Sequence, residues 1–148
     1  QVPEGDTPFY YPMTGILGEI SIVNIGVGYT LPFKIVGAPW IDAKGFAKQL
    51  NAQNFPGVYF HPFSYKPFYG KFSNTMCQGV LIVVTNHLIF KPVSTQYLII
   101  GVLKSLYPQK CFVIYFIKKQ CMAIVFATHF GQIILVKLGR FVWFYLVR

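Results

Sequence analysis

Acidic side chains are confined to the beginning of this 148-residue chain. The chain has four carboxylate side chains, and residues 43–148 contain none. With 13 lysines and arginines, the formal net charge is +9. Because soluble domains normally carry surface charges of both signs, we expect an acid-free segment either to be covered by another part or to be translated out of frame. The four acids are Glu4, Asp6, Glu19 and Asp42.

The composition excludes several classes of protein. Hydrophobic residues make up 54% of the chain and charged residues 11%, which is incompatible with intrinsic disorder, collagen or a coiled coil. The basic residues are dispersed, so no nucleic-acid partner is expected. The three cysteines and three histidines show neither disulfide-framework nor metal-ligand spacing, and we predict no metal and no cofactor.

The ends of the chain carry no targeting or membrane pattern. The N-terminus has no basic segment followed by an apolar one, so no signal peptide is expected in this chain, and localisation stays open. Residues 109–148 contain apolar blocks, but none approaches the 18 uninterrupted residues that a transmembrane helix needs, so membrane attachment is not expected. Four short strands and out-of-frame translation are both open interpretations of this segment.

The N-terminal region is rich in residues that favour loops and turns. Residues 1–15, with several prolines, glycines and tyrosines, are predicted to form an extended loop. Residues 16–36 are apolar and β-branched, which predicts short strands around a glycine-rich turn. Gly26 and Gly28 do not complete a dinucleotide-binding fingerprint, because Leu31 occupies the third glycine position, and we predict a tight turn there.

The middle of the chain alternates between strand and helix patterns. Asp42 is a predicted helix N-cap, since apolar residues recur after it at helical spacing. A continuous β-branched run at 79–85 indicates a buried strand. Strands alternating with two helices predict an α/β or α+β domain. The predicted elements are a helix at about 42–53, a strand at 58–67, a strand at 79–85, and a helix from Ser94 or Thr95 to Pro108.

Four sequence runs between Tyr11 and Pro108 carry a family resemblance. Their order and spacing resemble the exo-β-N-acetylmuramidases of NamZ type, which form domain-of-unknown-function family 1343 and glycoside hydrolase family 171. The runs are LPFKIVGAPWID (31–42), FAKQLNAQNFPGVYFHPFSYKPFYGKF (46–72), CQGVLIVVTN (77–86) and FKPVSTQYLIIGVLKSLYP (90–108).

The resemblance implies the C-terminal α/β domain of a two-domain hydrolase. Full-length family members have an additional Rossmann-like N-terminal domain, with the active site in the cleft between the domains, and some members may be exported. They remove terminal N-acetylmuramic acid from peptidoglycan fragments, so the implied partners are a peptidoglycan-derived sugar and the N-terminal domain. Residues 1–36 would be the end of the N-terminal domain with connecting strands, 37–108 the C-terminal domain, and 109–148 an atypical basic apolar tail of uncertain structure.

One family motif is altered in this chain. The family pattern E-G-T-N-x-S-E-G-R-G-T-T-R-P-F corresponds to residues 19–33. Glu19 falls on the first glutamate, whereas Ile25 takes the place of the second, and Val27 and Leu31 take the places of the two arginines. We therefore expect the isolated chain to be inactive. The alternative is a non-catalytic glycan-binding or relic module of the same family.

The candidate site residues follow from this comparison. Glycoside hydrolysis uses two carboxylates, one as acid and one as base or nucleophile. Glu19 is the predicted acid, because an apolar neighbourhood favours a protonated carboxyl, and its partner would come from the other domain. Aromatic rings stack on sugars and lysine pairs with a carboxylate, so aromatic and lysine residues are candidates for substrate binding. The alternative is that the aromatic residues form a core or interface cluster. The predicted substrate-binding residues are Asn24, Thr30, His61, Tyr65 and Lys71.

Two other polar residues are expected to be structural. Asp42 is better explained as the helix cap than as a catalytic acid. Cys77 opens a predicted buried strand and is expected to be packed there rather than to act as a nucleophile.

Overall fold

The chain divides into two compact units, Gln1–Pro108 and Gln109–Arg148. In this computed structural model, the described residues are 4–110, 134–138 and 141–145. In the second unit, β4 (Ile134–Leu138) pairs antiparallel with β5 (Phe141–Tyr145). Two of the four strands predicted in the tail coincide with β4 and β5, and the other two lie outside the described residues.

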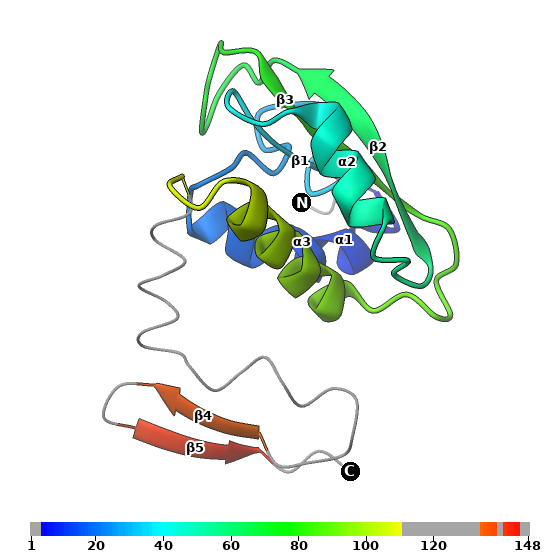
Figure 1. Ribbon diagram of the computed structural model, residues 1–148, viewed down its shortest axis with the longest axis vertical. Coiled ribbons are helices and arrows are strands. Elements are labelled where there is room, and N and C mark those ends of the chain that lie inside the picture. The colour runs from blue at the N-terminus through cyan, green and yellow to red at the C-terminus, as the bar shows by residue number, and fades with distance from the viewer. Residues whose placement is uncertain (1–3, 111–133, 139–140, 146–148) are drawn as a thin grey trace. The chain divides into compact units, whose positions relative to one another are not determined.

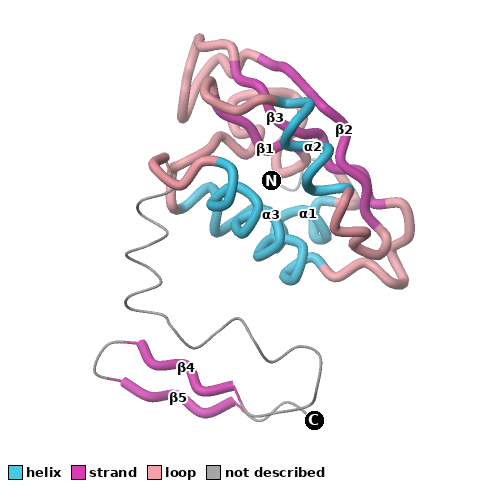
Figure 2. Tube along the Cα trace, viewed as in Figure 1, coloured by secondary structure: helices cyan, strands magenta, loops and turns pink. Residues whose placement is uncertain are grey.

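The first unit combines one antiparallel sheet with three helices, which confirms the predicted α/β class (Figures 1 and 2). The strand order is β1-β3-β2. Residues 1–36 and 37–108, which we expected to belong to two domains, lie together in this unit. Its elements are α1 (Thr7–Glu19), β1 (Ile35–Ala38), α2 (Ala43–Asn51), β2 (Val58–Tyr65), β3 (Cys77–Val84) and α3 (Pro92–Leu106).

Helix α1 corrects the prediction of an extended loop at residues 1–15. A proline in its first turn is tolerated, and Pro12 inside the helix removes one backbone hydrogen bond. Packing outweighs that loss, since α1 lies against α3 and the Ile16 amide donates to Gln96 Oε1 at 3.0 Å. The buried side chains of α1 follow helical spacing and are Thr7, Tyr10, Met13, Thr14 and Leu17.

The strands predicted within residues 16–36 are largely absent from the described structure. Asn24 forms an isolated bridge with Gly37, and the first strand of the sheet begins at Ile35. The predicted tight turn is confirmed, because Gly26 and Gly28 have φ angles of 85° and 86°. These are left-handed conformations that glycine adopts without a steric penalty.

The later elements agree with the sequence patterns. Asp42 caps α2 by accepting hydrogen bonds from the amides of Lys44 (3.2 Å) and Gly45 (3.1 Å). Strands β2 and β3 form where predicted. Helix α3 begins at Pro92, earlier than predicted, and Thr95 is inside it: the Thr95 hydroxyl donates to the Lys91 carbonyl at 2.9 Å instead of capping.

The helices cover one face of the sheet. Helix α2 packs on β2 and β3, α3 packs on α2, and α1 packs on α3. Phe46 of α2 and Phe60 of β2 are completely or almost completely buried between these layers. Among the described residues, no helix is both long and apolar enough to span a bilayer.

The opposite face of the sheet is covered at one end only. Tyr65 and Cys77 are register partners at the end where β2 leads into β3, and with Ile35 they form a buried cluster. Side chains from the glycine-rich turn and from the β2–β3 loop pack over this cluster. Farther along β2, Tyr59 and His61 on the same face are exposed.

Candidate functional site

A pocket of about 270 Å³ lies beside the C-terminal end of α1. Its wall combines the last turns of α1, the segment that follows this helix, and one residue of the β2–β3 loop. It brings together three predicted site residues that are distant in sequence, namely Glu19, Asn24 and Lys71. The wall residues therefore include one acid and one lysine, and the Lys71 ammonium lies 5.1 Å from the centroid of the Phe72 ring.

Glu19 is the last residue of α1 and the carboxylate at this pocket. Its side chain is exposed to solvent because the helix ends at the surface, although apolar residues share the pocket wall with it. Within residues 4–110, Glu19 forms no ion pair. The Glu19 carboxylate is thus accessible for contact with a ligand.

The other three carboxylates of the chain have structural partners. Glu4 and Asp6 both pair with the Lys34 ammonium, and Lys34 Nζ lies 3.1 Å from Asp6 Oδ2. Burial of Lys34 lowers its pKa, but the hydrogen bonds and charges of the two acids outweigh burial and raise the pKa above its ordinary value. Asp42 caps α2. Glu19 is therefore the one acidic side chain that has neither an ion pair nor a capping role within the described residues.

Asn24 holds the pocket together through its side-chain amide. Asn24 Nδ2 donates to the carbonyls of Val27 (3.0 Å) and Lys71 (2.9 Å). Asn24 Oδ1 accepts from the Gly26 amide (2.8 Å) and the Tyr65 hydroxyl (3.0 Å). All the hydrogen-bonding groups of this buried amide are used within the protein, so Asn24 positions Lys71 rather than offering its amide to a ligand.

Tyr65 is not part of the pocket wall, but it supports the wall residue Asn24. Its ring is buried, and its hydroxyl also lies 3.1 Å from the Asn24 carbonyl oxygen. Burial raises the pKa of Tyr65, and the neighbouring Cys77 raises it further, so the hydroxyl stays protonated as a donor. Cys77 is fully buried and burial raises the pKa of its thiol, which agrees with a packed cysteine rather than a nucleophile.

The structure does not bring the other two predicted residues into the pocket. Thr30 is exposed on the glycine-rich turn. His61 is exposed on β2, where its ring makes an edge contact with Tyr59 at a centroid distance of 4.7 Å. Both residues lie outside the pocket wall.

Two of the altered motif positions form part of the wall. Ile25 and Val27 line the pocket, so apolar side chains stand beside Glu19 where the family pattern has an acid and a guanidinium. Leu31 packs instead against the buried cluster of Ile35, Tyr65 and Cys77. The wall is consequently suited to the apolar face of a ligand on this side.

Helix α1 contributes wall residues that the sequence analysis missed. Tyr11, Gly15 and Gly18 line the pocket, but they fell within or beside the segment predicted as a loop. The helical spacing of buried residues at Tyr10 and Leu17 was a signal for this helix. Gly18 makes room for the Ile25 side chain, since a Cβ atom at this position would lie 2.5 Å from Ile25 Cδ1.

Most of the chain is similar to known proteins of one family. A family model described as exo-β-N-acetylmuramidase NamZ, C-terminal, matches residues 9–137, extending beyond Pro108. The peptidoglycan β-N-acetylmuramidase NamZ of Bacillus subtilis is 35% identical over 108 residues, covering 73% of this chain and 26% of that protein. The crystal structure of a DUF1343 family protein from Bacteroides fragilis is similar with a TM-score of 0.69 and 36% identity, covering 72% of this chain and 28% of the other. The chain thus spans about a quarter of the length of these relatives.

Proposed function

The chain belongs to the family of NamZ C-terminal domains, and on this premise we propose that its pocket binds the terminal sugar of a peptidoglycan fragment. The proposed ligand is N-acetylmuramic acid, and the proposed reaction of the longer protein is its release by glycoside hydrolysis. The observation that carries the proposal is the presence of Glu19 and Lys71 in one pocket of the domain.

The two charged residues have separate roles in this proposal. Lys71 meets the lactyl carboxylate of N-acetylmuramic acid, since an ammonium group binds a carboxylate through charge-assisted hydrogen bonds. Glu19 protonates the oxygen of the leaving group as a general acid. Ile25 and Val27 contact the less polar side of the sugar.

A second carboxylate is required for this chemistry. Retaining and inverting glycosidases both use two carboxylates, which lie roughly 5 to 9.5 Å apart. The whole chain has four, and three of them are held by Lys34 or by the α2 cap. We propose that the partner carboxylate comes from an N-terminal domain and that this chain alone does not hydrolyse the sugar.

A chimeric enzyme tests the proposal. Residues 9–137 would replace the matching segment of Bacillus subtilis NamZ, and release of N-acetylmuramic acid from a disaccharide with N-acetylglucosamine would be measured by chromatography. We expect release by the chimera and none by this chain alone. Glu19→Gln in the chimera should lower kcat by about 100-fold or more. Glu4→Gln, which alters a carboxylate outside the pocket, is the matched control, and release that survives Glu19→Gln would refute the catalytic role.

The second candidate function is a non-catalytic glycan-binding module. It is favoured by the apolar wall of Ile25 and Val27 beside the one available carboxylate. This candidate predicts that the chimera binds the disaccharide without releasing sugar. Restoration of the family residues by Ile25→Glu with Val27→Arg would then be expected to recover turnover.

A further inference from the structure

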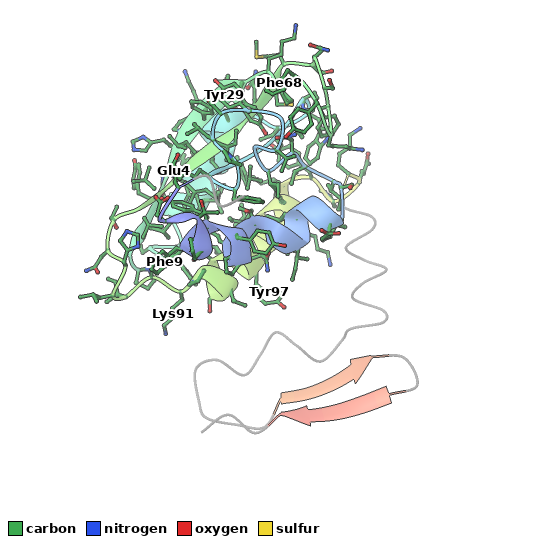
Figure 3. All side chains as sticks on the ribbon, turned by 180° about the vertical axis from the view of Figure 1, so that it is seen from behind. Glu4, Phe9, Tyr29, Phe68, Lys91 and Tyr97 are labelled. Atoms are coloured by element: carbon green, nitrogen blue, oxygen red, sulfur yellow. The ribbon has the colours of Figure 1, made fainter. Side chains whose placement is uncertain are left out.

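The loop between β2 and β3 exposes two adjacent aromatic side chains. The exposed fractions are 66% for Phe68 and 54% for Tyr69, and their ring centroids lie 4.9 Å apart in an edge contact. Phe68 lies at the end of the unit that also carries Tyr29 (Figure 3). Side chains of this size contribute most when they are covered, so their exposure indicates a surface for a ligand.

The backbone beneath these rings is firmly held. The Phe68 amide donates to the Gly28 carbonyl at 2.8 Å, and the Asn74 amide donates to the Pro67 carbonyl at 2.7 Å. A Cβ atom on Gly28 would lie 2.0 Å from the Tyr69 carbonyl oxygen, so the loop and the glycine-rich turn are in close contact. The loop is thus fixed before binding, which reduces the entropy lost when a ligand is bound.

The aromatic pair adjoins the pocket. Lys71 follows Tyr69 by two residues, and it is also part of the pocket wall, with its carbonyl fixed by Asn24. A Cβ atom on Gly70 would lie 3.5 Å from the carbonyl oxygen of Val27, another wall residue. Along the chain, the two rings therefore lie within three residues of the pocket-wall residue Lys71.

The charges around the rings select the ligand. Lys66 and Lys71 are exposed on either side of the pair, and neither forms an ion pair within the described residues. Aromatic rings stack on the apolar faces of sugar rings, and lysines attract carboxylates. The combination fits a glycan strand that carries carboxylate groups.

We propose that Phe68 and Tyr69 form a second sugar-binding site, the aromatic ledge, which stacks the next sugar of an anionic glycan strand whose terminal sugar occupies the pocket. The ledge rests on the proposed function, because the terminal sugar is placed by the pocket. It makes the domain selective for chains of several sugars over a single sugar.

Calorimetric titration of the full chain tests the ledge. The two probes are N-acetylmuramic acid and a tetrasaccharide of alternating N-acetylmuramic acid and N-acetylglucosamine. We expect the tetrasaccharide to bind roughly tenfold more tightly than the single sugar, and Phe68→Ala with Tyr69→Ala to abolish that advantage. Affinity for the single sugar should stay within about twofold of wild type, as stacking affects the second sugar alone.

Leu88→Ala is the matched control. Leu88 is 96% exposed in the loop between β3 and α3, at the opposite end of β3 from the ledge (Figure 1), so its truncation should change neither affinity. Lys66→Met is a second variant that keeps both rings and is expected to weaken the tetrasaccharide alone. Circular dichroism checks that each variant is folded.

The outcomes separate the two proposals. A tetrasaccharide advantage that persists in the ledge variants would overturn the ledge and leave the pocket proposal intact. An absence of single-sugar binding in wild type would overturn the pocket proposal and also the ledge proposal, which depends on it. Binding of vesicles of anionic phospholipid that is lost in the ledge variants, without sugar binding, would replace the glycan by a membrane and refute the ledge as proposed.

Discussion

Replacement of Asn24 by alanine should destabilise the first unit strongly. The Asn24 side chain is buried, with 2% of its surface exposed, and links the glycine-rich turn, the β2–β3 loop and Tyr65 through four hydrogen bonds. In Asn24→Ala, two carbonyls, one amide and one hydroxyl lose their partner. The Tyr65 hydroxyl keeps the Asn24 backbone carbonyl as an acceptor, so three groups are left fully dependent on water.

The expected magnitude follows from those three groups. A typical hydrogen bond stabilises a protein by about 1 kcal/mol, and a buried group left without a partner costs about 1–3 kcal/mol. Because the pocket lies alongside, water can reach part of this region, which favours the lower end for each group. We therefore expect a loss of about 3 kcal/mol in the free energy of unfolding, a large share of a typical stability of about 5–15 kcal/mol.

Urea denaturation of the full chain, followed by circular dichroism, measures this loss. Asn51→Ala is the matched control, since the half-buried Asn51 amide makes two hydrogen bonds to the backbone of Phe60, at 2.8 and 3.0 Å. Its expected cost is about 1–2 kcal/mol. If Asn24→Ala costs no more than Asn51→Ala, the account of Asn24 as the residue that joins the two loops is wrong.

Three further variants test other parts of the structure. Tyr65→Phe should lower the free energy of unfolding by about 1 kcal/mol at neutral pH. Because the pKa of Tyr65 is raised in the folded state, the stability advantage of wild type over this variant should be constant below pH 10.0 and shrink above it. A stability difference that grows with pH would contradict this. Gly28→Ala should cost about 2 kcal/mol or more, since its φ is 86° and the added carbon would clash with the Tyr69 carbonyl. Gly101→Ala in α3 should stabilise by up to about 1 kcal/mol, since the added carbon would have no atom within 4 Å among the described residues apart from its own helix backbone and chain neighbours, and thermal melts compare the two variants. The Cys77 thiol should resist alkylation at pH 8 until urea unfolds the chain, as measured by peptide mass spectrometry, and labelling without urea would show that it is not buried.

Strong local patterns allowed three elements of the fold to be predicted. Helix α2 has a capping carboxylate at Asp42 followed by apolar residues at helical spacing. Strands β2 and β3 are β-branched or alternate between buried and exposed residues. In each case, the residues that determine the element lie within the element itself.

Helix α1 was missed because distant residues stabilise it. Pro12 weakens the local preference for a helix, whereas packing against α3 and the hydrogen bond to Gln96 stabilise it. The start of α3 was misplaced for a related reason, since Pro92 suits the first turn of a helix without any side-chain cap.

The sequence singled out some of the residues that line the pocket, but it did not predict their arrangement. Glu19 and Lys71 were singled out from the sequence, and the structure places them at one pocket. Their proximity depends on the Asn24 amide, which links two loops that are distant in sequence, and no local pattern reports such a contact. A local pattern also does not distinguish the buried Tyr65 from the exposed His61 on the same strand.

We propose that the pocket beside α1 binds N-acetylmuramic acid through Lys71. The most direct test is titration of isotopically labelled full chain with this sugar, followed by NMR of the backbone amides. We predict saturable shifts at Gly15, Gly18 and Lys71, which line the pocket, together with far weaker shifts for N-acetylglucosamine, which lacks the lactyl carboxylate, and for Lys71→Met. Equal shifts with both sugars, or shifts confined to other parts of the chain, would contradict the account.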